Sequence, residues 1–376
     1  MPNSSILKKR CDRFLFSVVF SFLITVGFAQ QSLPAGQIIT DTITSEALMD
    51  SKLGDPHIRN MTIYLPPSYD SSSKIYPVIY LLHGHGGDEQ SFVGDLGEEL
   101  VVFLIDGMIN EGLVKEMILV MPDGKSKYGG SYYLNSELTG NYEDYIVYEI
   151  VDYVDENYRT IHDRNGRAIA GASMGGYGSI TLAMKHPDIF SSVVSLSPPL
   201  GFDTMAEELI PEVLRENPDV MADPGPNAKQ YTSYIYSLSA ALSPNLDNPP
   251  FFVDLPLEYP SGQVVEPVKQ RWLEGDPFTM LSTYGDSLRK MNGIYIDMGN
   301  EDLLGFNAAG DIFHQELIDM GIKHEYNIFQ GGHSDNVVDR AVALLEFLSP
   351  LLLDPTIPSL VSCENKLTIT WGAIKR

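Results

Sequence analysis

Short, continuous apolar segments alternate with amphipathic helical segments along most of this chain, and this alternation is the strongest constraint on its fold. Proline, glycine or polar residues bound the apolar segments, as in strands that are buried on both faces. The predicted strands are residues 59–65, 77–82, 117–121, 167–170, 192–196, 294–298 and 325–329. Such an alternation predicts an α/β domain with a mainly parallel central sheet and helices on both faces.

Between the strands, apolar residues recur with the period of an α-helix. In residues 143–158 they fall on one helical face: Val147, Ile150, Val151, Val154 and Tyr158. Similar patterns predict helices over residues 98–109, 175–185, 307–320 and 335–348. The predicted α/β domain covers residues 30–350, and residues 351–376 form a tail to which we assign no role.

The first 29 residues are predicted to be a secretory signal peptide. Basic residues between positions 8 and 13 precede the apolar run 14–29, which ends in Gly-Phe-Ala before Gln30. Small residues at these positions match a cleavage site. The alternative is an uncleaved membrane anchor, but the run is shorter than the roughly 20 residues of a typical span. We therefore expect a secreted or periplasmic protein with no membrane partner in its mature form.

Residues 200–277 interrupt the alternation, because they are rich in proline and show no clear strand. A long insertion in a compact α/β domain is usually a lid or binding loop, and this one follows a strand near the carboxyl edge of the sheet. We expect an inserted cap whose aromatic side chains offer stacking faces to the substrate; the alternative is a packed surface excursion without a role. These aromatic residues are Tyr231, Tyr234, Tyr236, Phe251, Phe252, Tyr259 and Trp272.

The charge of the chain disfavours one class of partner. With 25 Lys and Arg against 50 Asp and Glu, the formal net charge is −25. A strongly acidic surface repels nucleic acid and anionic membranes, so we expect no nucleic-acid partner. Of the two cysteines, Cys11 lies in the predicted signal peptide and only Cys363 would remain, which leaves no intramolecular disulfide.

A single serine lies where a predicted strand turns into a predicted helix. Residues 171–175 read Gly-Ala-Ser-Met-Gly, so Ser173 has a glycine two positions away on each side. A nucleophilic serine on a sharp strand-to-helix turn requires small residues at both positions. The motif alone is common and could mark only a tight turn, but its strand–turn–helix context indicates a nucleophile. Such a serine also needs a base, a group that orients the base, and donors for the oxyanion.

The base and its orienting acid should follow the last two strands, because on this kind of sheet the chain order is serine, acid, histidine. His333 lies in a glycine loop directly after the strand 325–329 and is the predicted base. The loop after the strand 294–298 holds the acid, predicted to be Asp302. Glu301 and Asp297 remain alternatives, and Asp302 could instead be a helix N-cap.

Backbone N–H groups are the expected oxyanion donors. One would come from Met174, which follows the nucleophile, and the other from His85 in the glycine-rich loop after the strand 77–82. His83 and His85 could also suggest a metal pair, but no carboxylates cluster with them in the sequence. We expect no metal ion.

Seven sequence motifs together resemble the esterase D-like α/β-hydrolases. They include YPVIYLLHGHGG at 76–87, GGSYYLNSELTGNYEDYI at 129–146 and AGASMGGYGSITLAMKHPDIF at 170–190, and the likeness extends over residues 37–348 except 200–277. This family includes feruloyl and acetyl-xylan esterases, S-formylglutathione hydrolase, enterochelin esterases and mycolyltransferases. The resemblance implies the α/β-hydrolase fold, the triad Ser173, Asp302 and His333, and no cofactor. It also implies that Tyr132, Tyr133 and Asn135 lie beside the acyl or leaving-group pocket.

Together these observations predict a secreted serine esterase that acts through an acyl-enzyme. The expected substrate is a small-molecule or oligosaccharide ester, such as an acyl or feruloyl ester of a carbohydrate, which the predicted export and the resemblance suggest. Three alternatives stay open: an acyltransferase with the same triad, a peptidase, and a non-catalytic binding protein on a hydrolase scaffold.

Overall fold

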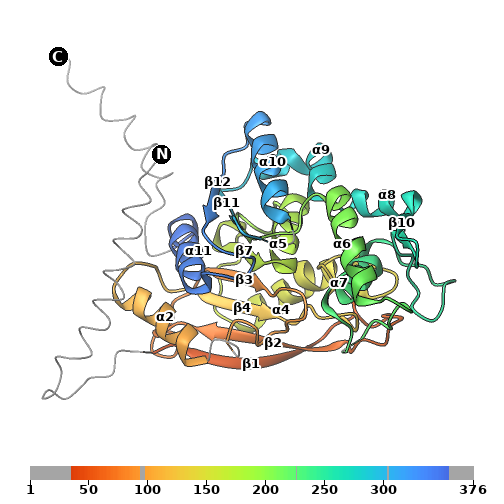
Figure 1. Cartoon of the computed structure of the whole chain (residues 1–376). Coiled ribbons are helices and arrows are strands. Elements are labelled where there is room, and N and C mark those ends of the chain that lie inside the picture. The colour runs from red at the N-terminus through yellow and green to blue at the C-terminus, as the bar shows by residue number, and fades with distance from the viewer. Residues whose placement is uncertain (1–34, 94–97, 226, 303–304, 355–376) are drawn as a thin grey trace, which may run out of the picture.

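The computed structural model describes residues 35–93, 98–225, 227–302 and 305–354. The predicted signal peptide and nearly all of the predicted tail lie outside the described residues. The main sheet has the strand order β1-β2-β4-β3-β7-β8-β11-β12 (Figure 1). Its strands are β1 (Gln37–Thr44), β2 (Ile58–Leu65), β3 (Val78–Leu82), β4 (Ile118–Pro122), β7 (Arg167–Ala172), β8 (Ser192–Leu196), β11 (Gly293–Gly299) and β12 (Glu325–Phe329).

The sheet is parallel from β4 to β12, whereas β1 and β2 pair antiparallel with each other and β2 pairs antiparallel with β4. The seven predicted strands are all present, and the predicted mainly parallel sheet is confirmed. The prediction missed β1. This strand lies at the edge of the sheet and reads QIITDTIT, so it has no continuous apolar run.

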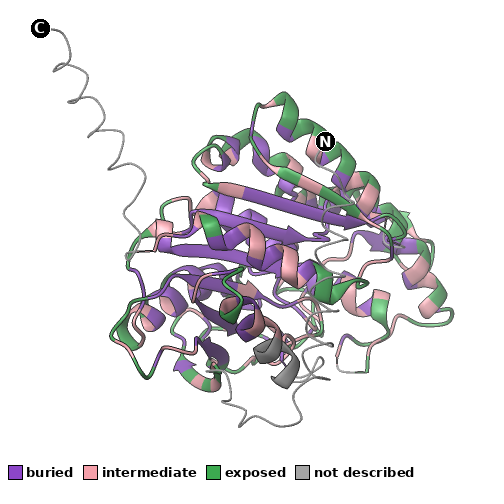
Figure 2. Ribbon diagram, turned by 90° about the vertical axis from the view of Figure 1, so that its left-hand side faces the viewer, coloured by how far each residue is buried: buried purple, intermediate pink, exposed green. Residues whose placement is uncertain are grey.

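Helices cover both faces of the sheet, as predicted. Side chains of α2 (Glu98–Asn110) and α11 (Val337–Leu351) pack with Ile79 and Ala168 on one face. Side chains of α5 (Met174–Lys185) and α10 (Phe306–Asp319) belong to the core on the other face, which includes Tyr80. Neighbouring strand residues point to opposite faces, so adjacent positions in one strand serve different cores. Figure 2 shows the resulting burial of the central strands.

The predicted helix over 143–158 is a helical stretch of three parts. It begins with α3 (Tyr142–Asp144), continues through a π-helical segment (Tyr145–Ile150) and ends with α4 (Val151–Asn157). A short hairpin precedes it, formed by β5 (Asn135–Ser136) and β6 (Gly140–Asn141).

The inserted segment is largely helical. It comprises α6 (Phe202–Glu216), α7 (Gln230–Leu242), the two-residue strands β9 (Leu257–Glu258) and β10 (Gln263–Val264), and α8 (Glu266–Glu274), and it leads into α9 (Pro277–Leu288). Figure 1 shows α6, α7 and α8 grouped beside α5, on the side of the molecule away from α2 and α11.

Some of the aromatic residues in the insert hold it together. Trp272 is fully buried, and its indole N–H donates to Ser243 Oγ at 3.1 Å. Tyr236 is only 2% exposed. Our expectation that these two side chains offer stacking faces to a substrate is therefore wrong, since their faces are already in contact with the core.

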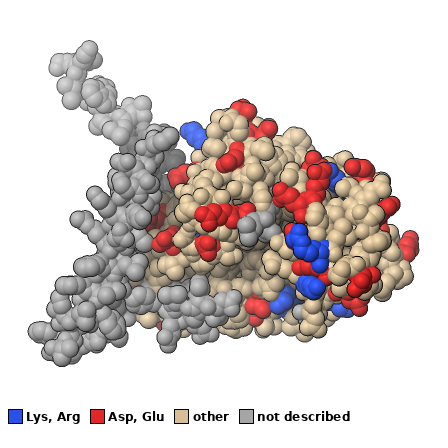
Figure 3. Space-filling model, viewed as in Figure 1, with Lys and Arg blue, Asp and Glu red and all other residues tan. Residues whose placement is uncertain are grey.

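Acidic side chains are widespread on the face of the molecule seen in Figure 3, and basic side chains are fewer there. This distribution agrees with the net charge of −25. Among the described residues, the structure has no helix that is both long and apolar enough to cross a membrane.

Candidate active site

Ser173 lies on a strained turn between β7 and α5. Its backbone has φ 56° and ψ −121°, a conformation that non-glycine residues rarely adopt. The chain is tightly packed around it: a Cβ added to Gly175 would lie 2.0 Å from the Leu82 carbonyl oxygen, and one added to Gly171 would lie 2.4 Å from Gly175. The two glycines flanking Ser173 are therefore required by close backbone contact, as the motif predicts.

The turn also places a positive helix end beside the serine. Met174 is the first residue of α5, and the N–H groups in the first turn of a helix have no intrahelical acceptor. The helix dipole adds partial positive charge there. An oxyanion next to Ser173 would be stabilised by both effects.

His333 and Asp302 meet, although they are far apart in sequence. Nδ1 of His333 lies 2.7 Å from Oδ2 of Asp302. The Asp302 side chain is fully buried, whereas the His333 side chain is 20% exposed. Since an ionised carboxylate only accepts, Nδ1 carries the proton and Nε2 is left as the basic nitrogen. His333 lines the same cavity as Ser173.

The two alternative acids have other partners. Asp297 is fully buried and forms an ion pair with Arg340, with Nε at 2.8 Å from Oδ2. Glu301 is exposed, and its carboxylate accepts a hydrogen bond from Gln330. Of the three candidate acids, Asp302 is the one whose carboxylate is recorded in contact with the imidazole of His333.

The glycine-rich loop after β3 packs directly against the nucleophile. A Cβ added to Gly84 would lie 3.4 Å from the Cβ of Ser173. The Gly86 N–H donates to the Gly129 carbonyl at 2.8 Å, which ties this loop to the one preceding Tyr132. His85 and Met174, the predicted oxyanion residues, line one cavity together with Ser173.

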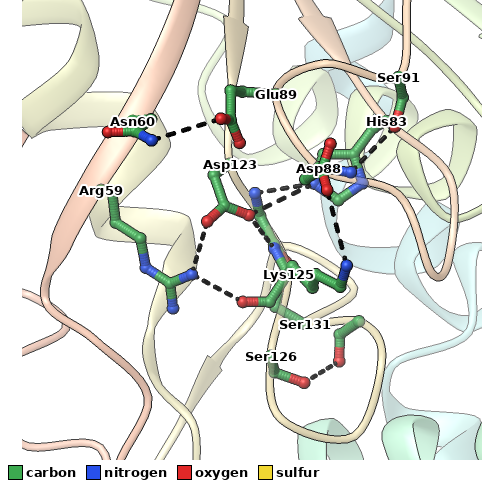
Figure 4. Close-up of polar contacts among 12 residues, drawn as sticks. Arg59, Asn60, His83, Asp88, Glu89, Ser91, Asp123, Lys125, Ser126 and Ser131 are labelled. Carbon is green, nitrogen blue, oxygen red and sulfur yellow. Dashed lines mark hydrogen bonds and ion pairs between the residues drawn. The ribbon is translucent and has the colours of Figure 1, made fainter. Parts of the chain in front are cut away.

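His83 stabilises the loop after β3 through hydrogen bonds of both its ring nitrogens to backbone groups. Its Nε2 accepts the Gly124 N–H at 2.8 Å, so its Nδ1–H must donate to the Gly84 carbonyl, also at 2.8 Å. Burial lowers the pKa of His83, which favours this neutral form. Figure 4 shows His83 beside Asp123, whose carboxylate accepts from Arg59 at 2.8 Å.

These contacts contradict a metal pair at His83 and His85, because both ring nitrogens of His83 are engaged with the backbone. In addition, no group of three or more His, Cys, Asp or Glu side chains suited to a metal ion occurs within the described part of the chain.

His85 lies between the loop and the insert. Its ring meets the ring of Tyr234 edge to face, with centroids 4.7 Å apart, and Ser233 Oγ lies 3.4 Å from its Nε2. Burial lowers its pKa to about 4, so the ring is neutral at neutral pH.

The three residues predicted to flank the pocket have separate positions. Tyr132 lines the cavity that contains His85 and Met174. Tyr133 is fully buried, and its hydroxyl donates to the His83 carbonyl at 2.9 Å. Asn135 is exposed, and its amide donates to Asp144 Oδ1 at 3.0 Å. The structure thus differs from the predicted placement of Tyr133 and Asn135, since both are directed to protein partners and neither lines the cavities at Ser173.

Two cavities meet at Ser173. The first, of about 230 Å³, extends between the sheet and the helices α2 and α11, and we name it the α2–α11 cavity. The second, of about 370 Å³, lies under the insert, and we name it the insert cavity. It is lined by His85, Tyr132, Ser173, Met174, Pro199, Met205, Glu208, Leu209, Pro211, Glu212, Tyr231, Tyr234 and Phe306.

Two further residues beside His333 were not predicted from the sequence. The Phe306 ring lies 5.5 Å from the His333 ring, centroid to centroid, and Arg340 donates to the His333 carbonyl at 3.2 Å. Neither belongs to a recognisable motif. The one sequence feature that could have indicated them is their position near the start of a helix. Phe306 follows the loop that contains Asp302, and Arg340 follows the loop that contains His333.

The family model described as "Putative esterase" matches residues 56–337. The chain belongs to this esterase family. Curated relatives include an esterase of Mycobacterium tuberculosis, 35% identical over 143 residues, and an endo-1,4-beta-xylanase/feruloyl esterase of Xylanibacter ruminicola, 31% identical over 161 residues. The matches cover 37% and 40% of this chain but only 29% and 21% of the two relatives, so the chain spans less than a third of either.

Solved structures of esterases share the fold. A ferulic acid esterase is similar with a TM-score of 0.58 and 23% identity, covering 85% of this chain and all of that one. An S-formylglutathione hydrolase from Staphylococcus aureus has a TM-score of 0.54 and 18% identity over 83% and 99% of the two chains. A ferulic acid esterase from Anaeromyces mucronatus in complex with ferulic acid has a TM-score of 0.51 and 19% identity over 86% and 93%. The predicted α/β-hydrolase fold is confirmed.

Proposed function

We propose that this protein is a serine carboxylic-ester hydrolase that uses Ser173, His333 and Asp302. The observation that carries the proposal is the 2.7 Å contact between His333 Nδ1 and the buried Asp302 carboxylate, in a site where His333 and the strained Ser173 line one cavity. A nucleophile, an oriented base and a buried acid are the parts that acyl transfer requires. Membership of the esterase family supports the same reaction.

In the first half of the reaction, Ser173 Oγ adds to the ester carbonyl carbon while Nε2 of His333 accepts the hydroxyl proton. The Met174 and His85 N–H groups stabilise the oxyanion. The carbon–oxygen bond to the alcohol then breaks, and His333 returns the proton to the departing alcohol. Asp302 stabilises the imidazolium and fixes its orientation.

In the second half, water attacks the acyl-enzyme, and His333 accepts a proton from this water. Collapse of the intermediate breaks the bond to Ser173 Oγ, which takes up the proton from His333. The products are a carboxylic acid and the free serine. The low pKa of His85, about 4, means that this ring carries no charge near neutral pH, so it does not compete with His333 as a cationic acid.

We propose acyl or feruloyl esters of carbohydrates as the substrate class. The insert cavity supports this assignment, because its lining includes the tyrosines Tyr231 and Tyr234 and the carboxylates Glu208 and Glu212. Tyrosine rings stack on sugars, and carboxylates accept hydrogen bonds from sugar hydroxyls. A relative is named endo-1,4-beta-xylanase/feruloyl esterase, and this name supports the proposal.

Export is part of the proposal. It rests on the basic segment followed by an apolar run in residues 8–29, and cell fractionation of the full chain with N-terminal sequencing of the product tests it. A mature protein that begins near Gln30 supports export, and an intact cytoplasmic chain contradicts it.

The test of the function is a hydrolysis screen. Wild type and Ser173→Ala are compared on p-nitrophenyl acetate, on acetylated xylo-oligosaccharides and on feruloylated arabino-oligosaccharides. We expect turnover by the wild type on at least one sugar ester and its loss in the variant. Hydrolysis of the p-nitrophenyl ester alone would overturn the sugar assignment, and no hydrolysis of any ester would overturn the reaction.

A further inference from the structure

The α2–α11 cavity differs from the insert cavity in the chemistry of its lining, although Ser173 lines both. Its lining residues are Ile79, Leu81, Phe92, Leu104, Ile105, Leu119, Met121, Ala172, Ser173, Leu196, His333, Ser334, Val337, Val338, Arg340, Ala341, Leu344 and Leu345. Apart from Ser173 and His333, the polar side chains among the described residues of this lining are Ser334 and Arg340. Arg340 is already paired with Asp297. The described residues of this lining therefore offer few hydrogen-bond partners.

This cavity leaves apolar side chains of the sheet incompletely covered. Leu81 and Ala172 lie in the central strands β3 and β7, where parallel strands are normally buried on both faces, yet each is partly exposed. At the cavity rim next to His333, Val337 is 42% exposed and Val338 is 39% exposed. An apolar surface that gathers around a reactive serine is the usual mark of an apolar ligand site.

We propose that the α2–α11 cavity binds the acyl chain of the ester substrate, and that this chain is aliphatic. The proposal rests on the proposed function, because it places the chain on the carbonyl carbon that Ser173 attacks. The insert cavity, with Glu208 and Tyr231, then receives the alcohol part. The site is thereby divided into an apolar acyl side and a polar alcohol side.

Chemistry favours an aliphatic chain over a feruloyl group on this side. A buried phenol hydroxyl without a hydrogen-bond partner costs free energy, and the described lining outside Ser173 and His333 offers it few partners. Each methylene buried in the cavity instead tightens binding by about fourfold. A medium-length acyl chain gains from this cavity, whereas an acetyl group gains almost nothing.

The helix α11 supplies a matched pair of variants. Ala341 lines the cavity on the same helical face as Val337, Val338, Leu344 and Leu345. Ala343 lies on the same helix, is also partly exposed, and is not part of the lining. Ala341→Phe should fill the cavity, and Ala343→Phe adds the same side chain elsewhere on the helix.

The experiment compares kcat/KM on p-nitrophenyl acetate, p-nitrophenyl octanoate and p-nitrophenyl ferulate for wild type, both alanine variants and Ser173→Ala. We expect the wild type to prefer octanoate, Ala341→Phe to lose about 30-fold on octanoate with acetate unchanged within about threefold, and Ala343→Phe to resemble the wild type. Thermal unfolding of all variants checks that they fold. If Ala341→Phe unfolds, the smaller Ala341→Val variant should show the same selectivity with a smaller loss.

Three contrary outcomes are distinguishable. An unchanged octanoate-to-acetate ratio in folded Ala341→Phe and Ala341→Val, with all activity still dependent on Ser173, would overturn the acyl placement and leave the proposed hydrolase intact. Turnover of both esters by Ser173→Ala at the wild-type rate would overturn the proposed function itself. A wild type that prefers feruloyl esters, with the preference unaffected by Ala341→Phe, would move the acyl group to the insert cavity.

Discussion

Arg340 forms a bidentate ion pair with Asp297 and also contacts the backbone of the loop that contains His333. Nε lies 2.8 Å from Oδ2, Nη2 lies 2.9 Å from Oδ1, and Nη1 donates to the His333 carbonyl at 3.2 Å. Both side chains are buried. The pair therefore connects the end of β11 and the start of α11 to the backbone of the proposed base.

Arg340→Met is expected to lower the free energy of unfolding by about 3–5 kcal/mol, because it leaves the Asp297 carboxylate buried without its counter-charge. Urea unfolding measures the effect. The double variant Arg340→Met with Asp297→Leu should recover much of the loss, since it removes the uncompensated charge. A single variant that loses less than about 1 kcal/mol, or a double variant that loses as much as the sum, would contradict this role.

Asp302→Asn is expected to lower kcat by about 10⁴, because an amide at this position favours the wrong tautomer of His333. Glu301→Gln is the matched control, one residue away, and should change kcat by less than about twofold, since Glu301 contacts Gln330 on the surface. Steady-state kinetics on p-nitrophenyl acetate measures both. A larger loss of kcat in Glu301→Gln than in Asp302→Asn would indicate that Glu301 is the acid that orients His333.

The parts of the site that the sequence predicted are those in which a local pattern carries the chemistry. Ser173 lies between glycines that close packing requires, and His333 follows the last strand. The acid was ambiguous, because Asp297, Glu301 and Asp302 lie within one short stretch. Only the folded positions separate them, since one is paired with Arg340, one is on the surface and one contacts His333.

The proline and aromatic content of residues 200–277 did not predict the structure of the inserted segment correctly. Its proline content suggested a shaped loop, but Pro267 and Pro277 lie at the start of helices α8 and α9, where proline is well tolerated. Pro211 even lies inside α6. Its aromatic content likewise could not separate core from cavity: Trp272 is buried, whereas Tyr231 and Tyr234 line the insert cavity.

The structure predicts a loss of stability on acidification that involves His85. Burial lowers the pKa of His85 to about 4, below the value of about 6.5 in an unfolded chain. The unfolded state therefore binds the proton first as the pH falls. The neutral ring therefore makes its full contribution to the free energy of unfolding above pH 6.5, and this contribution declines as the pH falls toward 4.

This pH effect is measured by the free energy of unfolding of wild type and His85→Asn between pH 7.5 and pH 4. The advantage of the wild type should shrink by up to about 3 kcal/mol over this range. His83 is present in both proteins, so its own titration is common to the two curves. Parallel curves would contradict the assigned cause.

Tyr231 tests whether the insert contributes binding rather than chemistry. Tyr231→Ala is expected to raise KM for a feruloylated or acetylated oligosaccharide about tenfold, with kcat/KM on p-nitrophenyl acetate nearly unchanged. Tyr284→Ala on α9 is the control, because Tyr284 is also partly buried but lines neither cavity. Equal losses on both substrates would indicate a structural role for Tyr231.

The central claim is that Ser173 is the nucleophile, and covalent labelling tests it most directly. A fluorophosphonate reacts only with a serine that a neighbouring base activates. After reaction of the wild type, peptide mass spectrometry should find a single adduct on Ser173, and ester hydrolysis should fall in proportion to labelling. Ser173→Ala should remain unlabelled and lose on the order of a millionfold in turnover. An adduct on a different residue, or a fully labelled protein that still hydrolyses esters, would contradict the account.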